Sequence, residues 1–133
     1  MAKITALSNI PYLTRLAGEA LTAGELGCIK VSDGKIYKAV DSTGYIACGL
    51  VEESADSGAN ATLTFPVCWI DNSSTNALGI ANLGTLAYAE DETTVSTNAA
   101  NGDLIVGKLL SVDSSLGALV DLNIKATDVA SAT

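Results

Sequence analysis

The chain has 133 residues, enough for one compact domain with its own hydrophobic core. Hydrophobic residues make up 48% of it and charged residues only 17%, which predicts either an alanine-rich core under a neutral surface or apolar surface covered by partners. We favour the covered surface. The formal net charge of −8 opposes binding to the phosphate backbone of nucleic acids.

Two further classes of protein are disfavoured by the sequence. No segment has the apolar length needed to cross a bilayer, and the N-terminal residues lack the continuous apolar stretch of a secretory signal, so we expect no membrane partner. The chain has no histidine, and its three cysteines lie in apolar surroundings without nearby ligand pairs. We therefore expect free buried thiols, made in a reducing cytoplasm, and neither a metal site nor a cofactor; the cysteines are Cys28, Cys48 and Cys68.

Residues 1–16 are predicted to form an N-terminal arm. Apolar side chains recur there every three residues, while Pro11 interrupts any helix through them. This spacing suits a short helical turn or an extended segment that lies on another surface. The residues of the arm that we expect to contact a partner are Lys3, Ile4, Leu7, Ile10, Pro11, Tyr12, Leu13, Arg15 and Leu16.

Three short strands are predicted next, at Cys28–Val31, Lys35–Val40 and Tyr45–Val51. The first two are joined by a turn that contains Asp33 and Gly34, and Asp-Gly is a strong signal for a β-hairpin.

The segment Thr62–Ile70 alternates most regularly and is predicted to be one strand. Because Pro66 cannot donate a hydrogen bond to a neighbouring strand, we expect an edge strand or a bulge there. One face of this strand is predicted to carry Leu63, Phe65, Val67 and Trp69.

The second half of the chain is also expected to be mainly β. Gly79 and Gly84 favour a short helical turn before further strands at Thr85–Tyr88 and Thr93–Thr97. A final strand pair, Leu104–Val112 and Ala118–Lys125, is predicted to bury Val120, Leu122 and Ile124. Strands this short, with turn signals between them, predict an all-β sandwich or a small β-barrel with at most one short helix. The expected organisation is an arm at 1–16, a β-rich domain at 17–125 and a C-terminal tail at 126–133.

The titratable residues do not form a recognisable catalytic set, so we expect no enzyme. Without histidine, a serine hydrolase would need a lysine base in a Ser-x-x-Lys motif, which the sequence lacks. The acids Glu52, Glu53 and Glu90–Glu92 are interpreted as solvated turn residues rather than catalytic carboxylates or calcium ligands. The aromatic residues are sugar-stacking candidates but are interpreted mainly as core: Trp69, Tyr12, Tyr37, Tyr45 and Tyr88.

The order of the predicted strands resembles that of one known group of proteins. GKIYKAV (34–40) and GYIACGLV (44–51) precede an acidic, glycine-rich loop and the 63–70 strand. NLGTLAY (82–88), TVST (94–97), DLIVGKLL (103–110) and ALVDLNI (118–124) follow. Together they are similar to the capsid cement, or head decoration, proteins of tailed bacteriophages, over roughly residues 17–124.

This resemblance implies a small β-barrel or β-tulip-like module that assembles into trimers on the outer face of the virion capsid. Such a protein is made in the host cytoplasm, binds the major capsid protein after shell expansion and stabilises the head. The arm then has either the capsid protein or a neighbouring subunit as its partner. The alternative function is a receptor- or glycan-binding module of a phage fibre or surface appendage.

Overall fold

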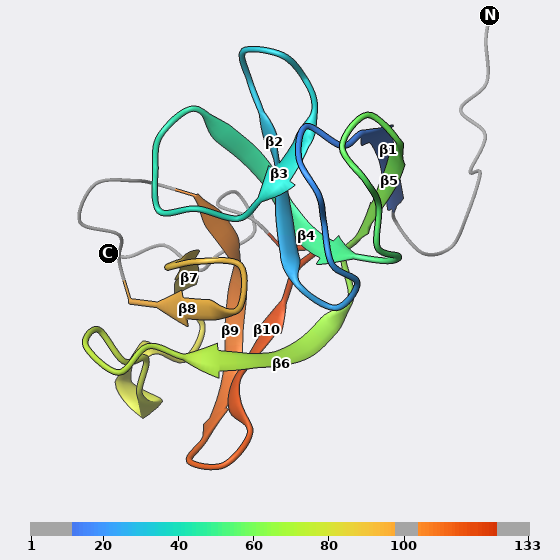
Figure 1. Cartoon of the computed structure of the whole chain (residues 1–133). Helices are drawn as coiled ribbons and strands as arrows, with labels where there is room; N and C mark the ends of the chain where they lie inside the picture. The colour runs from blue at the N-terminus through green and yellow to red at the C-terminus, as the bar shows by residue number, and fades with distance from the viewer. Residues whose placement is uncertain (1–11, 98–103, 125–133) are drawn as a thin grey trace, which may run out of the picture.

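The computed structural model describes residues 12–97 and 104–124, and these form a small barrel joined to a twisted sheet (Figure 1). The sheet has the strand order β1-β5-β4-β2-β3. Its strands are β1 (Tyr12–Leu16), β2 (Leu26–Lys30), β3 (Ile36–Lys38), β4 (Tyr45–Val51) and β5 (Asn60–Thr64). All of its neighbouring strands run antiparallel.

The closed barrel has the strand order β10-β6-β8-β7-β9. Its strands are β6 (Val67–Asn72), β7 (Leu86–Ala89), β8 (Thr94–Ser96), β9 (Ile105–Asp113) and β10 (Gly117–Asp121). A 3-10 helix, η1 (Ile80–Asn82), precedes β7 and is the single helical element in the described ranges. The mainly β fold with a small barrel, predicted from the sequence, is confirmed.

The core consists of two clusters that meet at Phe65. The larger cluster joins barrel residues such as Val106 and Val120 to Leu26, Cys28 and Cys48 of the sheet. The smaller cluster lies within the sheet and is made of Ala17, Leu21, Ile29, Ile36, Val51, Ala61 and Leu63. Since the half-buried Phe65 packs against both clusters, the sheet and the barrel share one continuous apolar interior.

Local turn signals led to correct predictions. The β2–β3 hairpin forms at the expected place, with Gly34 at φ +72° and its amide donating to the carbonyl of Lys30 at 2.8 Å. The first strand begins earlier than predicted and ends at Lys30, whereas β3 is shorter than predicted and covers only Ile36–Lys38. The predicted strand at 45–51 is confirmed, as are η1 and the pairing of the last two strands as a hairpin. However, β10 ends at Asp121 rather than running on as predicted, so Leu122, which is buried, and Ile124, which is only half-buried, lie beyond it.

The prediction of one strand over Thr62–Ile70 is wrong. The chain forms β5 before Pro66 and β6 after it, and these strands belong to different sheets. The buried face changes at the same point, because Leu63 is fully buried whereas 51% of Val67 and 40% of Trp69 is exposed. In β6 the buried residue is Ile70 instead.

The structure describes only the end of the predicted arm. Tyr12–Leu16 is strand β1, which pairs with β5 of the same chain, so these residues are part of the sheet. Residues 1–11 and the predicted tail at 126–133 lie outside the described residues.

Candidate interaction surfaces

Strand β1 is an edge of the sheet, and most of it is exposed. Its inner side pairs with β5 from Tyr12 opposite Thr64 to Leu16 opposite Asn60, while no strand in the described ranges pairs with its outer side. Leu13 packs against the smaller core cluster. In contrast, 52% of Tyr12 and 47% of Leu16 is exposed. An edge strand with exposed apolar side chains is a surface on which another protein can dock.

Of the arm residues predicted to contact a partner, the structure therefore places four. Tyr12, Arg15 and Leu16 are exposed on β1, whereas Leu13 holds the strand to the core. The other five lie outside the described residues: Lys3, Ile4, Leu7, Ile10 and Pro11.

A second open edge lies in β6, within the segment where Pro66 predicts an edge strand or a bulge. In an antiparallel pair the peptide groups of successive residues point alternately toward and away from the partner strand. The amide of Leu122 donates to the carbonyl of Pro66 at 3.1 Å, so the peptide groups of Cys68 and Ile70 face β10. Those of Val67 and Trp69 therefore face the opposite edge.

Strand β8 covers only the far end of this opposite edge. Pairing with β8 begins at Asp71, opposite Thr94, and the amide of Ser73 donates to the carbonyl of Val95 at 2.8 Å. Within the described part of the chain, no strand pairs with β6 on this side at Val67 and Trp69. The barrel is thus closed at one end of β6 and open at the other.

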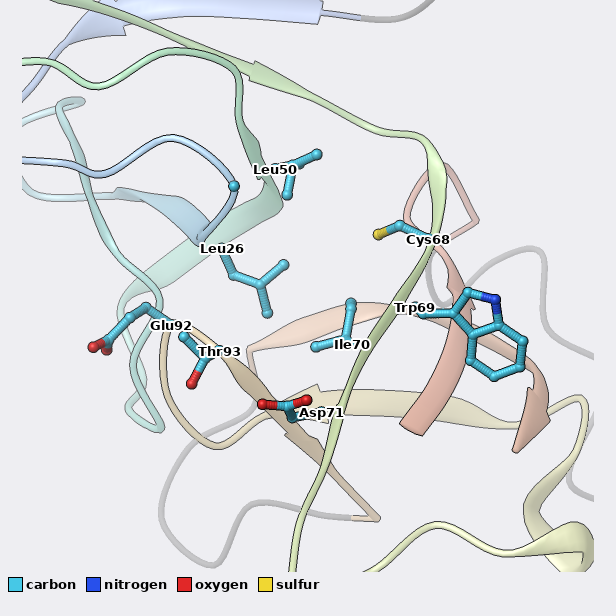
Figure 2. Close-up of a pocket in the computed structure, with 9 residues that line it drawn as sticks. Leu26, Leu50, Cys68, Trp69, Ile70, Asp71, Glu92 and Thr93 are labelled. Atoms are coloured by element: carbon cyan, nitrogen blue, oxygen red, sulfur yellow. The ribbon is translucent and has the colours of Figure 1, made fainter. Parts of the chain in front are cut away.

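A pocket of about 430 Å³ adjoins this part of β6 (Figure 2). Leu26, Leu50 and Ile70 give it apolar walls, and Asp71 and Glu92 place carboxylates at the side away from Leu50. Its full lining is Gly24, Leu26, Leu50, Cys68, Trp69, Ile70, Asp71, Glu92 and Thr93. The pocket therefore combines apolar surface with negative charge.

The interpretation of Trp69 as a core residue is wrong. Its side chain is 40% exposed and points away from the pocket, on the outer surface of the barrel (Figure 2). There it faces Leu119 across the β6–β10 pair. Tyr12 is also exposed, while the other tyrosines are half-buried: Tyr37, Tyr45 and Tyr88.

Tyr37 belongs to a polar cluster on the β2–β3 hairpin. Its hydroxyl donates to the Asp33 carboxylate at 2.5 Å, the Lys30 ammonium lies 5.3 Å from its ring centroid, and its ring meets that of Tyr45 edge-on. The hydrogen bond between Tyr37 and Asp33 is the main cause of two opposite shifts: it raises the pKa of Tyr37 and lowers the pKa of Asp33. These contacts fix the hairpin turn.

Two of the acidic residues, Glu90 and Asp91, accept hydrogen bonds in the turn between β7 and β8. Asp91 accepts hydrogen bonds from the amide and hydroxyl of Thr93 at 2.9 and 3.1 Å. Glu90 is half-buried rather than solvated as predicted, and it accepts a 2.6 Å hydrogen bond from the buried hydroxyl of Ser73. Glu52 and Glu53 are exposed, as expected, beside a pocket of about 300 Å³.

The three cysteines are thiols rather than disulfides, as predicted, but they differ in burial. Cys28 and Cys48 are fully buried, whereas Cys68 is half-buried and lines the pocket beside β6. Burial raises the pKa of the Cys28 thiol to about 12 and also raises the pKa of Cys68. No group of three or more His, Cys, Asp or Glu side chains that could hold a metal ion occurs in residues 12–97 and 104–124.

The described residues contain no helix that is long and apolar enough to span a membrane. Comparison with protein-family models, curated proteins and solved structures found no match.

Proposed function

We propose that this chain is a virion structural protein that binds the outer face of a phage capsid as a trimer and stabilises the expanded head. The resemblance of its strand order to head decoration proteins suggests this function, and a small, mainly β module is compatible with it. The major capsid protein is the proposed partner on the shell, and other copies of the chain are the partners within the trimer.

The observation that carries the proposal is the exposed edge at β1. A small domain that keeps Tyr12 and Leu16 half-exposed on an edge strand has an apolar surface and unpaired peptide groups available to a partner. Arg15 adds a positive charge on the same strand, in a chain that is otherwise strongly acidic. We infer that this edge contacts the shell.

Trimerisation would strengthen a contact made by this five-residue strand. Three copies of the β1 edge, held in one particle, engage three equivalent sites on a symmetric shell, so the second and third contacts form at high effective concentration. Each individual interface can then be small while the trimer dissociates slowly.

Co-sedimentation with purified expanded heads tests the proposal. The full chain should pellet with the heads, and light scattering should give the mass of three copies in solution. Replacing both Tyr12 and Leu16 with aspartate should weaken head binding at least about 10-fold, because each change places a charge in an apolar contact. A matched control is Val31→Asp, which adds a charge at an apolar residue that is 61% exposed and lies outside β1.

The proposal fails if the unaltered chain stays in the supernatant with heads that lack their decoration protein. If the control variant and the β1 variant lose head binding equally, the claim that the β1 edge contacts the shell is contradicted.

The exposed Trp69 favours a second candidate, a glycan-binding module of a phage fibre or surface appendage. Tryptophan rings on open surfaces stack on sugars, and 40% of this side chain is exposed. Binding of the purified chain to a glycan array, abolished by Trp69→Ala, would favour this candidate over the capsid protein.

A further inference from the structure

We propose that the open edge of β6 binds residues 1–11 of a neighbouring copy of this chain as an added β-strand. The inference rests on the proposed function only in taking a trimer as the assembly. It assigns the N-terminal residues a partner within that assembly, while the β1 edge remains the contact to the shell.

The first support is the unpaired backbone of β6. Val67 and Trp69 direct their peptide groups away from β10, and β8 pairs with this side only from Asp71 onward. An exposed strand edge is the usual template for a peptide that adds by backbone hydrogen bonds. A short incoming strand is enough to cover this gap.

The second support is the match between the pocket and the N-terminal sequence. The pocket offers apolar walls at Leu26 and Leu50 and carboxylates at Asp71 and Glu92. Residues 1–11 contain the apolar side chains Ile4, Leu7 and Ile10, and their one charged side chain is Lys3.

Charge also favours this occupant over another part of the chain. Since Lys3 contributes +1 and the whole chain −8, the remainder of each copy carries −9. Two such bodies repel each other, whereas the N-terminal residues are attracted to the acidic side of the pocket.

The third support is that residues 1–11 cannot easily extend the β1–β5 ladder of their own copy. Strand β1 pairs with β5 up to Tyr12 opposite Thr64. Continuing in this register would set Pro11 opposite Phe65 and Ile10 opposite Pro66. Because the amide of Ala17 donates to the carbonyl of Ala59 in the same register, Pro11 and Phe65 would face each other as a hydrogen-bonded pair. Pro11 has no amide to donate to Phe65, so the ladder loses a hydrogen bond at its first added step. A head-to-tail contact to the next copy can instead close into a ring of three.

Cysteine cross-linking of the full chain tests this inference directly, because Cys68 already lines the pocket. A Leu7→Cys variant, oxidised with diamide at low protein concentration, should give covalent dimers and trimers on a non-reducing gel. These bands should vanish in the Leu7→Cys, Cys68→Ser double variant. Val31→Cys supplies a control thiol at an exposed position far from β6 in sequence, and it should give few or no linked chains.

Two results overturn the inference. One is an internal disulfide between the thiol introduced by Leu7→Cys and Cys68 that leaves the chain monomeric on the gel, which would mean that the segment binds its own copy. The other is the absence of any bond to Cys68 while the thiols still react with a maleimide. A peptide with the sequence of residues 1–11, added in excess, should reduce the linked bands at least about 3-fold by competition.

Charge reversal adds a second readout. Lys3→Glu should lower the cross-linking rate of the Leu7→Cys variant by about 2- to 5-fold, as expected for an exposed ion pair. Adding Asp71→Lys should restore most of this rate. Light scattering and head co-sedimentation on the same proteins separate the two proposals. If the chain is a trimer that co-sediments with heads but forms no disulfide to Cys68, only this inference is refuted. If the chain is a monomer that does not co-sediment with heads, the proposed function is refuted.

Discussion

Gly107 of β9 lies directly against the backbone of Asp121 in β10. A Cβ atom at this glycine would sit 2.1 Å from the Asp121 carbonyl oxygen and 2.8 Å from its carbonyl carbon. Atoms this close cannot be accommodated by rotating a side chain, because both belong to the main chain of the barrel. The absence of a side chain at this position therefore allows the two strands to approach each other.

We therefore expect Gly107→Ala to lower the free energy of unfolding by about 3 kcal/mol or more, since the barrel must shift to admit the methyl group. Urea denaturation followed by Trp69 fluorescence measures this change. Gly79→Ala is the control, because its new Cβ would lie 3.9 Å from the nearest side-chain atom and its φ is −128°. Equal midpoints for the two variants would contradict the prediction.

Ser73 and Glu90 form a hydrogen-bonded pair, largely buried, that holds the loop after β6. The hydroxyl of Ser73 donates to Glu90 and accepts from the amides of Thr75 and Asn76 at 3.2 and 3.0 Å. Ser73→Ala should cost about 1–3 kcal/mol of stability, because it leaves these groups without their partner.

A double-mutant cycle with Glu90→Ala, which removes the acceptor of the Ser73 hydroxyl, separates the pair from the loop amides. If the Ser73–Glu90 hydrogen bond contributes as expected, the double variant should lose less free energy of unfolding than the two single variants lose together, by at least about 0.5 kcal/mol. Ser115→Ala, at an exposed turn, should change stability by less than about 0.5 kcal/mol.

The hydrogen bond between Asp33 and Tyr37 on the β2–β3 hairpin can be tested by measuring the pKa of Tyr37. The Asp33 carboxylate accepts a hydrogen bond from the Tyr37 hydroxyl, which raises the pKa of the tyrosine above its ordinary value. Asp33→Asn removes the negative charge that opposes ionisation, so the pKa of Tyr37 should fall. NMR titration of the tyrosine ring carbons measures it. A fall of similar size at Tyr88, which lies in the barrel, would show that the effect is not specific to the pair.

The sequence was sufficient to predict features that depend on neighbouring residues. The Asp33–Gly34 turn, the strand at Tyr45–Val51 and the final hairpin were all found, because turn chemistry and alternation act over a few residues. The mainly β class followed from these elements. The thiol state of the three cysteines was also predicted, because an odd number of cysteines cannot all pair within one chain and each lies in an apolar stretch.

Features that depend on distant parts of the chain were not predicted. The alternation over Thr62–Ile70 is regular, but which side is buried depends on the layer that covers each half, and that layer changes at Pro66. Likewise, Tyr12–Leu16 was assigned to an arm because its partner strand begins at Asn60, far along the sequence. The open edge of β6 depends on where β8 begins, which no local pattern specifies.

The buried thiol of Cys28 predicts how stability changes in alkaline solution. Desolvation raises its pKa from 9.0 to about 12 in the folded protein. Between these values the unfolded chain has lost the thiol proton while the folded protein retains it, so unfolding is favoured as pH rises. Titration of the Cys28 thiol should therefore lower the free energy of unfolding by at most about 1.4 kcal/mol for each pH unit above about 9.

Urea denaturation of the reduced protein tests this prediction when it is repeated from about pH 8 to about pH 11, a range that spans the titration of the unfolded thiol. The Cys28→Ala variant serves as the comparison. The variant should be less stable at the lowest pH, because Cys28 is fully buried and its loss leaves a cavity. Its stability should nevertheless decline less steeply as the pH rises than that of the unaltered chain. Ionisation of tyrosine and lysine affects the pH dependence of stability in both proteins. The difference between the slopes of the unaltered chain and the variant therefore measures the contribution of the Cys28 thiol. Parallel curves would mean that Cys28 does not control the alkaline transition.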